Sequence, residues 1–213
     1  MDGAATVIAV VNQKGGTGKT TVTMNLAAGL ARRGRTLVVD GDPQGSAGQW
    51  ARMAPEERPF PASVFAVAGP LDRELKALRR DFEFIVVDCP PTLEGGTVSG
   101  ALAAADQVLI PVLPSPMDLW GSVRMGRQLD DAKAANPKLK PCIVVNQVEV
   151  RSALSRAMKS ALMEIDIPAL EQHLRRRAIY RRAALEGGSV YDLGKPGLAA
   201  AAEIDAIIDE VLA

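Results

Sequence analysis

The feature that most constrains this chain is a glycine-rich run near its amino end, KGGTGKT at residues 14–20. The run follows an apolar stretch typical of a buried strand and precedes a stretch with helical spacing. Glycines there let successive backbone N–H groups turn inward around a phosphate, and the following helix adds the positive end of its dipole. The run therefore predicts a phosphate-binding loop between a strand and a helix.

The last residues of the run predict roles for individual side chains. Lys19 is expected to reach the β- and γ-phosphates of a nucleotide, and Thr20 to offer its hydroxyl to Mg²⁺. A dinucleotide-binding fingerprint fits poorly, because Thr21 stands where its third glycine should fall. The loop is a variant, since Gln13 replaces a usual glycine and a lysine, Lys14, precedes the glycines. The expected nucleotide-binding residues of the loop are Gly15, Gly16, Thr17, Gly18, Lys19, Thr20 and Thr21.

Short runs rich in valine and isoleucine recur between stretches of helical spacing. Hydrophobic residues make up 47% of the 213 residues and aromatic residues only 4%, which suits an aliphatic core between a parallel sheet and its helices. We predict one domain over residues 1–213, a three-layer α/β P-loop NTPase fold with a mainly parallel twisted sheet flanked by helices. The expected strands are residues 6–11, 37–40, 63–67, 84–88, 107–112 and 142–148, with a surface loop at 55–61 and a helix at 197–212.

Polar residues close several of these strands. Asp88 ends an apolar run, the position at which P-loop proteins place a carboxylate that helps order magnesium. Asp40 and Asp42 follow another strand, and Asn146 ends a third. Because ligands bind beyond the carboxyl ends of parallel strands, these side chains are candidates for one shared site. The alternative for each of these residues is that it only forms the turn after its strand, since Asp and Asn are favoured in turns.

Four segments together resemble the deviant Walker A ATPases, and most closely their ParA branch of partition and cargo-positioning ATPases. The segments are residues 14–20, 40–45, 86–91 and 111–118. The resemblance implies that Lys14 crosses the interface of an ATP-bound sandwich homodimer and touches the partner's phosphates. A cation supplied in this way acts as an arginine finger does in other NTPases. Weak intrinsic ATP hydrolysis is also expected, since slow turnover times the life of the dimer.

The same resemblance extends the set of expected site residues. It implies that Asp42 orients or activates the attacking water, so that Lys14, Lys19 and Asp42 form the catalytic set. It places Asp40 near the magnesium shell, with Thr20 and Asp88 as the other metal-site residues. It also places the adenine ring beside Asn146 and the loop that contains Pro114. ATP and Mg²⁺ are the implied ligand and metal.

Charge is unevenly distributed along a chain that has 25 basic and 25 acidic residues. Residues 151–182 hold eight basic residues against three acidic ones. An arginine-rich helix is often only a solvated face, but with the family resemblance we favour contacts with DNA phosphates. No helix-turn-helix module is expected before the first strand, so these contacts should be nonspecific. The expected DNA-binding residues are Arg151, Arg156, Arg175, Arg176, Arg177, Arg181 and Arg182.

Two features bear on location. Cys89 and Cys142 are far apart and form no C-x-x-C pair, which favours a reducing cytosol. The chain has neither a signal-peptide pattern nor an apolar run of about 18 residues, and its last predicted helix is acidic, which argues against an anionic membrane surface. A membrane-surface ATPase of the MinD kind is therefore the weaker alternative, and a metabolic P-loop enzyme remains another.

These features lead to one functional expectation. An ATP-bound dimer would bind nonspecific DNA, and a ParB-like or cargo-adaptor protein would stimulate hydrolysis and release it. The protein would then be cytoplasmic and associated with the nucleoid, over which it positions its cargo. Plasmids, chromosome origins, chemoreceptor clusters and carboxysomes are all cargoes that such ATPases serve.

Overall fold

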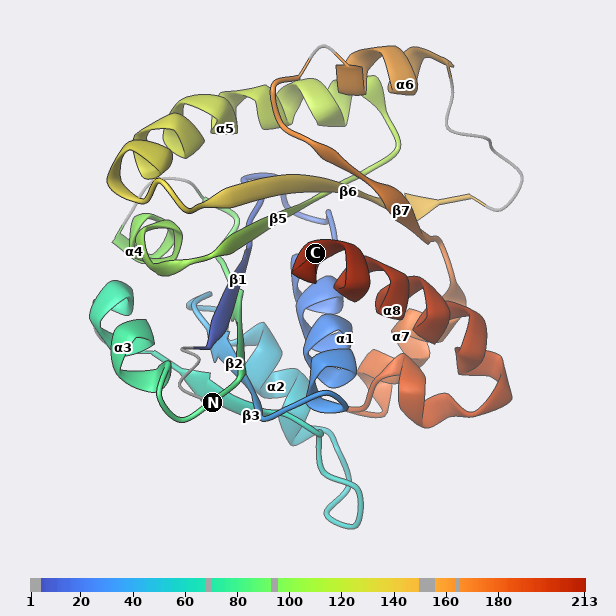
Figure 1. Cartoon of the computed structure of the whole chain (residues 1–213). Helices are drawn as coiled ribbons and strands as arrows, with labels where there is room; N and C mark the ends of the chain where they lie inside the picture. Colours follow the sequence, from blue (N-terminus) through green and yellow to red (C-terminus); the bar gives the residue numbers. More distant parts are fainter. Residues whose placement is uncertain (1–4, 68–69, 93–95, 150–155, 164) are drawn as a thin grey trace.

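The computed structural model describes residues 5–67, 70–92, 96–149, 156–163 and 165–213. Seven parallel strands form one sheet in the order β3-β2-β4-β1-β5-β6-β7, with helices on both faces (Figure 1). The predicted three-layer α/β fold is confirmed. The strands are β1 (Thr6–Val10), β2 (Thr36–Asp40), β3 (Ser63–Ala66), β4 (Phe84–Asp88), β5 (Gln107–Val112), β6 (Lys140–Val148) and β7 (Ala169–Arg175).

The helices divide into two groups, one on each face of the sheet. Alternate side chains of a strand point to opposite faces, so Val7 and Ala9 of β1 join one core while Ile8 and Val10 join the other. Helices α3, α4, α5 and α6 cover the first core, and α1, α2, α7 and α8 cover the second. The helices are α1 (Lys19–Ala31), α2 (Ser46–Arg52), α3 (Leu71–Leu78), α4 (Gly96–Ala104), α5 (Pro116–Ala135), α6 (Arg156–Met163), α7 (Ala178–Leu185) and α8 (Leu198–Leu212), with short 3-10 turns η1 (Val190–Leu193) and η2 (Lys195–Gly197) before α8.

The sequence pattern identified six strands and missed β7, which lies at the edge of the sheet. Only Leu174 of this strand is buried, so β7 lacks the continuous apolar run of a central strand. The carboxylate of Glu210 in α8 accepts hydrogen bonds from the backbone N–H groups of Glu171 (2.6 Å) and Gln172 (3.2 Å). These hydrogen bonds to α8 satisfy backbone N–H groups of the edge strand. The hydrophobic pattern of the sequence could not reveal such a strand.

The carboxyl-terminal helix and the proline-bounded loop were both predicted. Ile204, Ile207 and Ile208 of α8 are buried in the second core, as the helical spacing indicated. Residues 55–61 contain neither helix nor strand and project from the lower side of the molecule in Figure 1. None of the helices in the described ranges is both long enough and apolar enough to cross a membrane.

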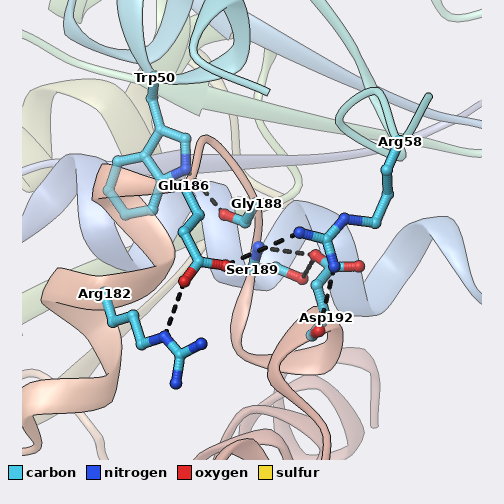
Figure 2. Close-up of polar contacts among 7 residues, drawn as sticks. All are labelled: Trp50, Arg58, Arg182, Glu186, Gly188, Ser189 and Asp192. Atoms are coloured by element: carbon cyan, nitrogen blue, oxygen red, sulfur yellow. Dashed lines mark hydrogen bonds and ion pairs between the residues drawn. The ribbon is translucent and has the colours of Figure 1, made fainter. Parts of the chain in front are cut away.

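A buried hydrogen bond joins α2 to the segment after α7 (Figure 2). The indole N–H of Trp50 donates to the backbone oxygen of Gly188 over 2.8 Å. The neighbouring Gly187 has a φ of +64°, and a Cβ there would lie 2.0 Å from the backbone nitrogen of Ala54. Glycine is therefore required where these two segments touch, because any side chain would collide with backbone. The contact links the element that follows the Asp42 loop to α7.

We expect Trp50→Phe to destabilise the folded protein by about 1–3 kcal/mol, because it leaves the buried oxygen of Gly188 without its donor. Tyr180→Phe is the matched control, since the buried Tyr180 hydroxyl makes no hydrogen bond within the described residues. Urea unfolding of the two variants and the wild type measures the difference. Equal stability of Trp50→Phe and Tyr180→Phe would contradict the importance of the α2–α7 contact.

Candidate functional site

The glycine-rich loop leaves β1 in the middle of the sheet and is fixed by the side chain of Asn12. The carboxamide oxygen of Asn12 accepts the backbone N–H of Lys14 at 2.8 Å, and its nitrogen donates to the backbone oxygen of Pro111 at 2.9 Å. Gly16 and Gly18 have φ angles of +78° and +88°, a region that favours glycine. The loop thus has the backbone conformation that the sequence pattern required.

The end of β6 supports the loop from the other side. Asn146 donates from its side-chain nitrogen to the backbone oxygen of Thr17 at 2.7 Å and accepts the backbone N–H of Gln147 at 2.8 Å. Gln147 in turn donates to the backbone oxygen of Gly16 at 3.3 Å and has a φ of +60°. Both polar atoms of the Asn146 amide therefore contact backbone, which gives this residue a role in supporting the loop beyond the base contact expected for it. Only its place directly after Asn146 could have singled out Gln147 in the sequence.

Lys19, Thr20 and Asp88 meet at the start of α1. The Thr20 hydroxyl donates to one carboxylate oxygen of Asp88 at 2.7 Å, and the Thr23 hydroxyl donates to the other at 3.2 Å. The pKa of Asp88 is raised to about 6, chiefly by burial and to a lesser extent by the nearby carboxylate of Asp40. The hydrogen bonds from Thr20 and Thr23 and the charge of Lys19 lower this pKa and so limit the rise. Burial also lowers the pKa of Lys19.

This cluster fits a magnesium ion with a bound polyphosphate. Burial makes the ionised form of a carboxylate unfavourable, and a divalent cation bound beside it would stabilise that form. Carboxylate and hydroxyl oxygens are ligands that Mg²⁺ accepts, commonly together with phosphate oxygens and water. Thr20 and Asp88 would hold the metal, and Lys19 would face the phosphates. The expected third metal-site residue, Asp40, also lies beside this cluster.

The carboxylate of Asp40 shapes the following loop. One of its oxygens accepts the backbone N–H of Asp42 at 3.3 Å, and the other accepts the backbone N–H of Gly48 in α2 at 2.8 Å. The strand register places Asp40 directly beside Asp88, so the two carboxylates are neighbours as expected. Both oxygens of Asp40 thus hold the backbone of the loop that carries Asp42, and its expected place near the magnesium shell stays a prediction. Asp42 itself is partly exposed.

Lys14 is held within its own subunit. Its ammonium group forms an ion pair with the carboxylate of Asp118, in the first turn of α5. The side chain of Lys14 is 53% exposed, whereas that of Asp118 is 12% exposed. Lys14 therefore lies at the surface beside the loop, where a second molecule can reach it.

A cavity of about 730 Å³ opens beside the loop and extends to α7. Its walls include Gly18, Thr21 and Asn146 on one side, and the segment from Arg175 to Arg181 on the other. This volume is within the range of small-molecule sites, so a nucleoside attached to phosphates in the loop would fit. The structure brings Asn146 to this cavity, whereas Pro114 does not line it.

The arginines of the basic segment, residues 151–182, are divided between several elements. Arg175 ends β7, Arg177 is the N-cap of α7, and Arg181 and Arg182 lie within α7. Arg175, Arg176 and Arg177 therefore lie at the end of β7 and before α7, and not within a helix. Arg151 lies outside the described residues, and Arg156 starts α6 without a described side chain.

Acidic residues from outside the basic segment offset much of its charge. Arg177 forms an ion pair with Glu203 of α8 through three hydrogen bonds, the shortest of 2.6 Å. Arg176 pairs with Glu149 at 3.3 Å. Figure 2 shows Arg182 paired at 2.7 Å with Glu186, whose carboxylate also lies 3.7 Å from Arg58. Counting charges over residues 151–182 missed these pairs, because Glu149, Glu186 and Glu203 lie outside that range.

Comparison with known proteins agrees with this geometry. Residues 8–190 match the family described as the CobQ/CobB/MinD/ParA nucleotide binding domain. The chain belongs to this family, and the resemblance to deviant Walker A proteins seen in its motifs is confirmed. It is similar to maintenance of carboxysome distribution protein A of Halothiobacillus neapolitanus, with 43% identity over 210 residues that cover 98% of this chain and 97% of that protein. It is also similar to the chromosome-partitioning ATPase Soj of Thermus thermophilus, with 34% identity over 186 residues that cover 73% and 74% of the two chains.

Solved structures share the fold at lower identity. The apo form of McdA from Cyanothece superposes with a TM-score of 0.76 at 18% identity, covering 98% of this chain and 100% of that one. The septum site-determining protein MinD of Pyrococcus horikoshii, complexed with Mg-ADP, gives a TM-score of 0.76 at 22% identity, covering 98% and 97%. At these identities the likeness establishes a common three-layer architecture.

We expect Lys19→Ala to weaken ATP binding by roughly 10- to 100-fold, because it removes a charged donor from the phosphates. Titration calorimetry with ATP and Mg²⁺ measures this loss. Lys76→Ala, on the exposed side of α3, is the control and should bind ATP as the wild type does. Unchanged ATP affinity of Lys19→Ala would contradict the assignment of the phosphate site.

Proposed function

We propose that this protein is a ParA-type ATPase that positions a cellular cargo over the nucleoid, and that the cargo is a carboxysome. The observation that carries the proposal is a P-loop whose Thr20 bonds the buried Asp88, with a second lysine, Lys14, beside it at the surface. The carboxysome as cargo is supported by the relative of Halothiobacillus neapolitanus named for carboxysome distribution, which matches nearly the whole chain.

ATP and Mg²⁺ are the proposed ligand and metal. Backbone N–H groups of residues 15–21 and the ammonium group of Lys19 would hold the phosphates, while Thr20 and Asp88 would hold the metal. The metal supplies charge that stabilises the phosphate oxygens when bound. The cavity lined by Thr21 and Asn146 would receive the nucleoside.

Asp42 is the proposed hydrolytic residue. It follows β2 and lies on a loop held by Asp40 from within and by a hydrogen bond of 2.9 Å from the Gly41 N–H to the backbone oxygen of Asp88. A carboxylate held in this way can orient a water molecule or accept its proton. Intrinsic turnover would be weak, because the set of charges is incomplete until a second subunit contributes its Lys14.

The ion pair between Lys14 and Asp118 supports a switch between monomer and dimer. In the isolated subunit the ammonium group is occupied by a carboxylate of the same chain. In an ATP-bound homodimer, Lys14 would exchange Asp118 for the phosphates bound by the partner. Both are charge-assisted contacts, so the free-energy difference between the two arrangements would be small. ATP binding and dimerisation would then be linked equilibria.

We expect Lys14→Gln to retain ATP binding but to lose ATP-dependent dimerisation, because an amide cannot replace the cation at the interface. Sedimentation velocity with ATP and Mg²⁺ measures the dimer, and we expect its affinity to fall at least roughly tenfold. Lys195→Gln, an exposed lysine before α8, is the control. Equal dimerisation of Lys14→Gln and the wild type would remove Lys14 from the interface.

Nonspecific DNA is the proposed surface on which the dimer moves. The arginines that suit this role are the exposed Arg176, Arg181 and Arg182, whereas Arg177 is tied to Glu203. Dimerisation would place two such sets on one assembly, which increases the number of phosphate contacts. A ParB-like adaptor on the cargo would stimulate hydrolysis and release the dimer. The protein would be cytoplasmic and associated with the nucleoid.

We expect Asp42→Ala to bind random-sequence duplex DNA with ATP, and to bind far more weakly with ADP or without nucleotide. Phosphate contacts release counterions, so the affinity should fall steeply as salt rises. Fluorescence anisotropy of labelled DNA across a salt series measures both effects, with Lys19→Ala as a control that cannot reach the ATP state. Absence of DNA binding in every state would reject the nucleoid model and favour a metabolic or purely protein-directed ATPase.

A further inference from the structure

One wall of the nucleotide cavity belongs to the edge of the sheet. Arg175 ends β7 and Arg177 is the N-cap of α7, and both line the cavity together with Arg176 and Ala178. We call residues 175–178 the edge wall. An edge strand pairs with a single neighbour, so the sheet supports this wall less than it supports the glycine-rich loop, which leaves the central strand β1.

The ladder between β6 and β7 is irregular where it reaches the edge wall. Val145 of β6 pairs with His173 and Val148 pairs with Arg175, and the register shifts between these two pairs. Irregular pairing of this kind leaves backbone groups outside the ladder. Beyond the ladder, the backbone N–H of Arg176 donates to the backbone oxygen of Val148 at 2.8 Å. The edge wall therefore depends on support from outside the sheet.

A carboxylate of α8 supplies such support. Glu203 accepts the backbone N–H of Arg175 at 3.2 Å and three hydrogen bonds from the guanidinium group of Arg177, the shortest of 2.6 Å. The side chains of Glu203 and Arg177 are only 15% and 26% exposed. Loss of one partner would thus leave a partly buried charge without its counterion. Glu203 ties the end of β7 and the start of α7 to the same helix.

A second carboxylate of α8 makes the same kind of contact at another place. Glu210 accepts the backbone N–H groups of Glu171 and Gln172, near the start of β7. In the described part of the chain, the residues that line the nucleotide cavity include neither Glu210 nor these two partners. Both carboxylates therefore hold β7, but Glu203 holds the end that faces the cavity.

From these contacts we infer that Glu203 is a positioning residue for ATP, which fixes the edge wall in the shape that receives the nucleoside. The inference rests on the proposed function, since it concerns the ATP site of that function. Glu203 acts through Arg175 and Arg177, because the cavity's lining residues in the described ranges do not include Glu203 itself. A wall that is already fixed loses less conformational entropy when a nucleoside packs against it. The phosphates would be bound by the glycine-rich loop, so their binding does not depend on the edge wall.

Charge and shape predict opposite effects when this carboxylate is removed. Removal of a negative charge near a site for a polyanion should by itself strengthen the binding of ATP and of inorganic tripolyphosphate. Loss of the shape of the edge wall should instead weaken only the ligand that carries a nucleoside. Comparison of these two ligands therefore separates positioning from electrostatics.

The test uses the full-length Glu203→Ala variant and titration calorimetry with Mg²⁺. We expect its ATP affinity to fall roughly tenfold, whereas its tripolyphosphate affinity should rise or stay within about twofold of the wild type. Glu210→Ala is the matched control and should bind both ligands as the wild type does. Unchanged ATP affinity of Glu203→Ala, or equal loss of both ligands, would overturn the inference. An equal loss of ATP affinity in Glu210→Ala would also overturn it, because general support of β7 would then explain the effect.

Steady-state ATP hydrolysis gives a second measurement. When hydrolysis is slow, KM reports nucleotide binding, so Glu203→Ala should raise KM for ATP and keep the wild-type kcat at saturating ATP. A lower kcat with an unchanged KM would contradict a role in nucleoside binding. Failure of the wild type to bind ATP or tripolyphosphate would count against the phosphate site of the proposed function. Wild-type binding that Glu203→Ala retains unchanged would count against Glu203 alone.

Discussion

The carboxylate of Asp88 is the interaction on which the rest of the site depends. It is buried at the end of β4, next to β1, and receives two hydroxyl hydrogen bonds from α1. The backbone oxygen of the same residue accepts the N–H of Gly41. One residue thus connects the helix after the phosphate loop, the central sheet and the loop that carries Asp42. Because burial disfavours its charge, the arrangement is most favourable when a cation is present.

The polar residues around Asp88 are mostly engaged in holding backbone. Asn12, Asp40 and Asn146 each form hydrogen bonds with main-chain groups of the loops around the site. This gives the loops a defined shape before any ligand arrives, so that less conformational entropy is lost on binding. Lys14 differs, since its side chain is half exposed and its ammonium group is paired with one carboxylate. The proposed nucleotide-dependent dimer would use this combination of a backbone-held loop and an exposed lysine.

The two faces of the sheet carry different groups of residues beside the site. The face that carries α7 and α8 holds the arginines and their acidic partners, and these pairs leave only part of the basic charge available for DNA. The opposite face carries a cavity lined by α3, α4 and α5, and Thr97 of α4 lies near Gly41. Both sets of residues lie near the carboxyl ends of strands, since α4 follows β4 and α7 follows β7. This shared position follows from the parallel sheet, in which every strand ends at the same edge.

The sequence by itself determined the fold class, six strands, the last helix and the phosphate loop. The elements depend on local periodicity, and the loop depends on a glycine spacing that is specific to phosphate binding. It also brought out Thr20 and Asp88, since their positions follow from a loop and a strand end. Only the tertiary structure revealed β7, whose polar residues are stabilised by a distant helix, and the pairing of Arg177 with Glu203, 26 residues away. It likewise decided that Asp40 holds a loop and that small residues of α4 line a cavity. Ion pairs and cavities arise between segments that are remote in sequence, so no local pattern of residues can specify them.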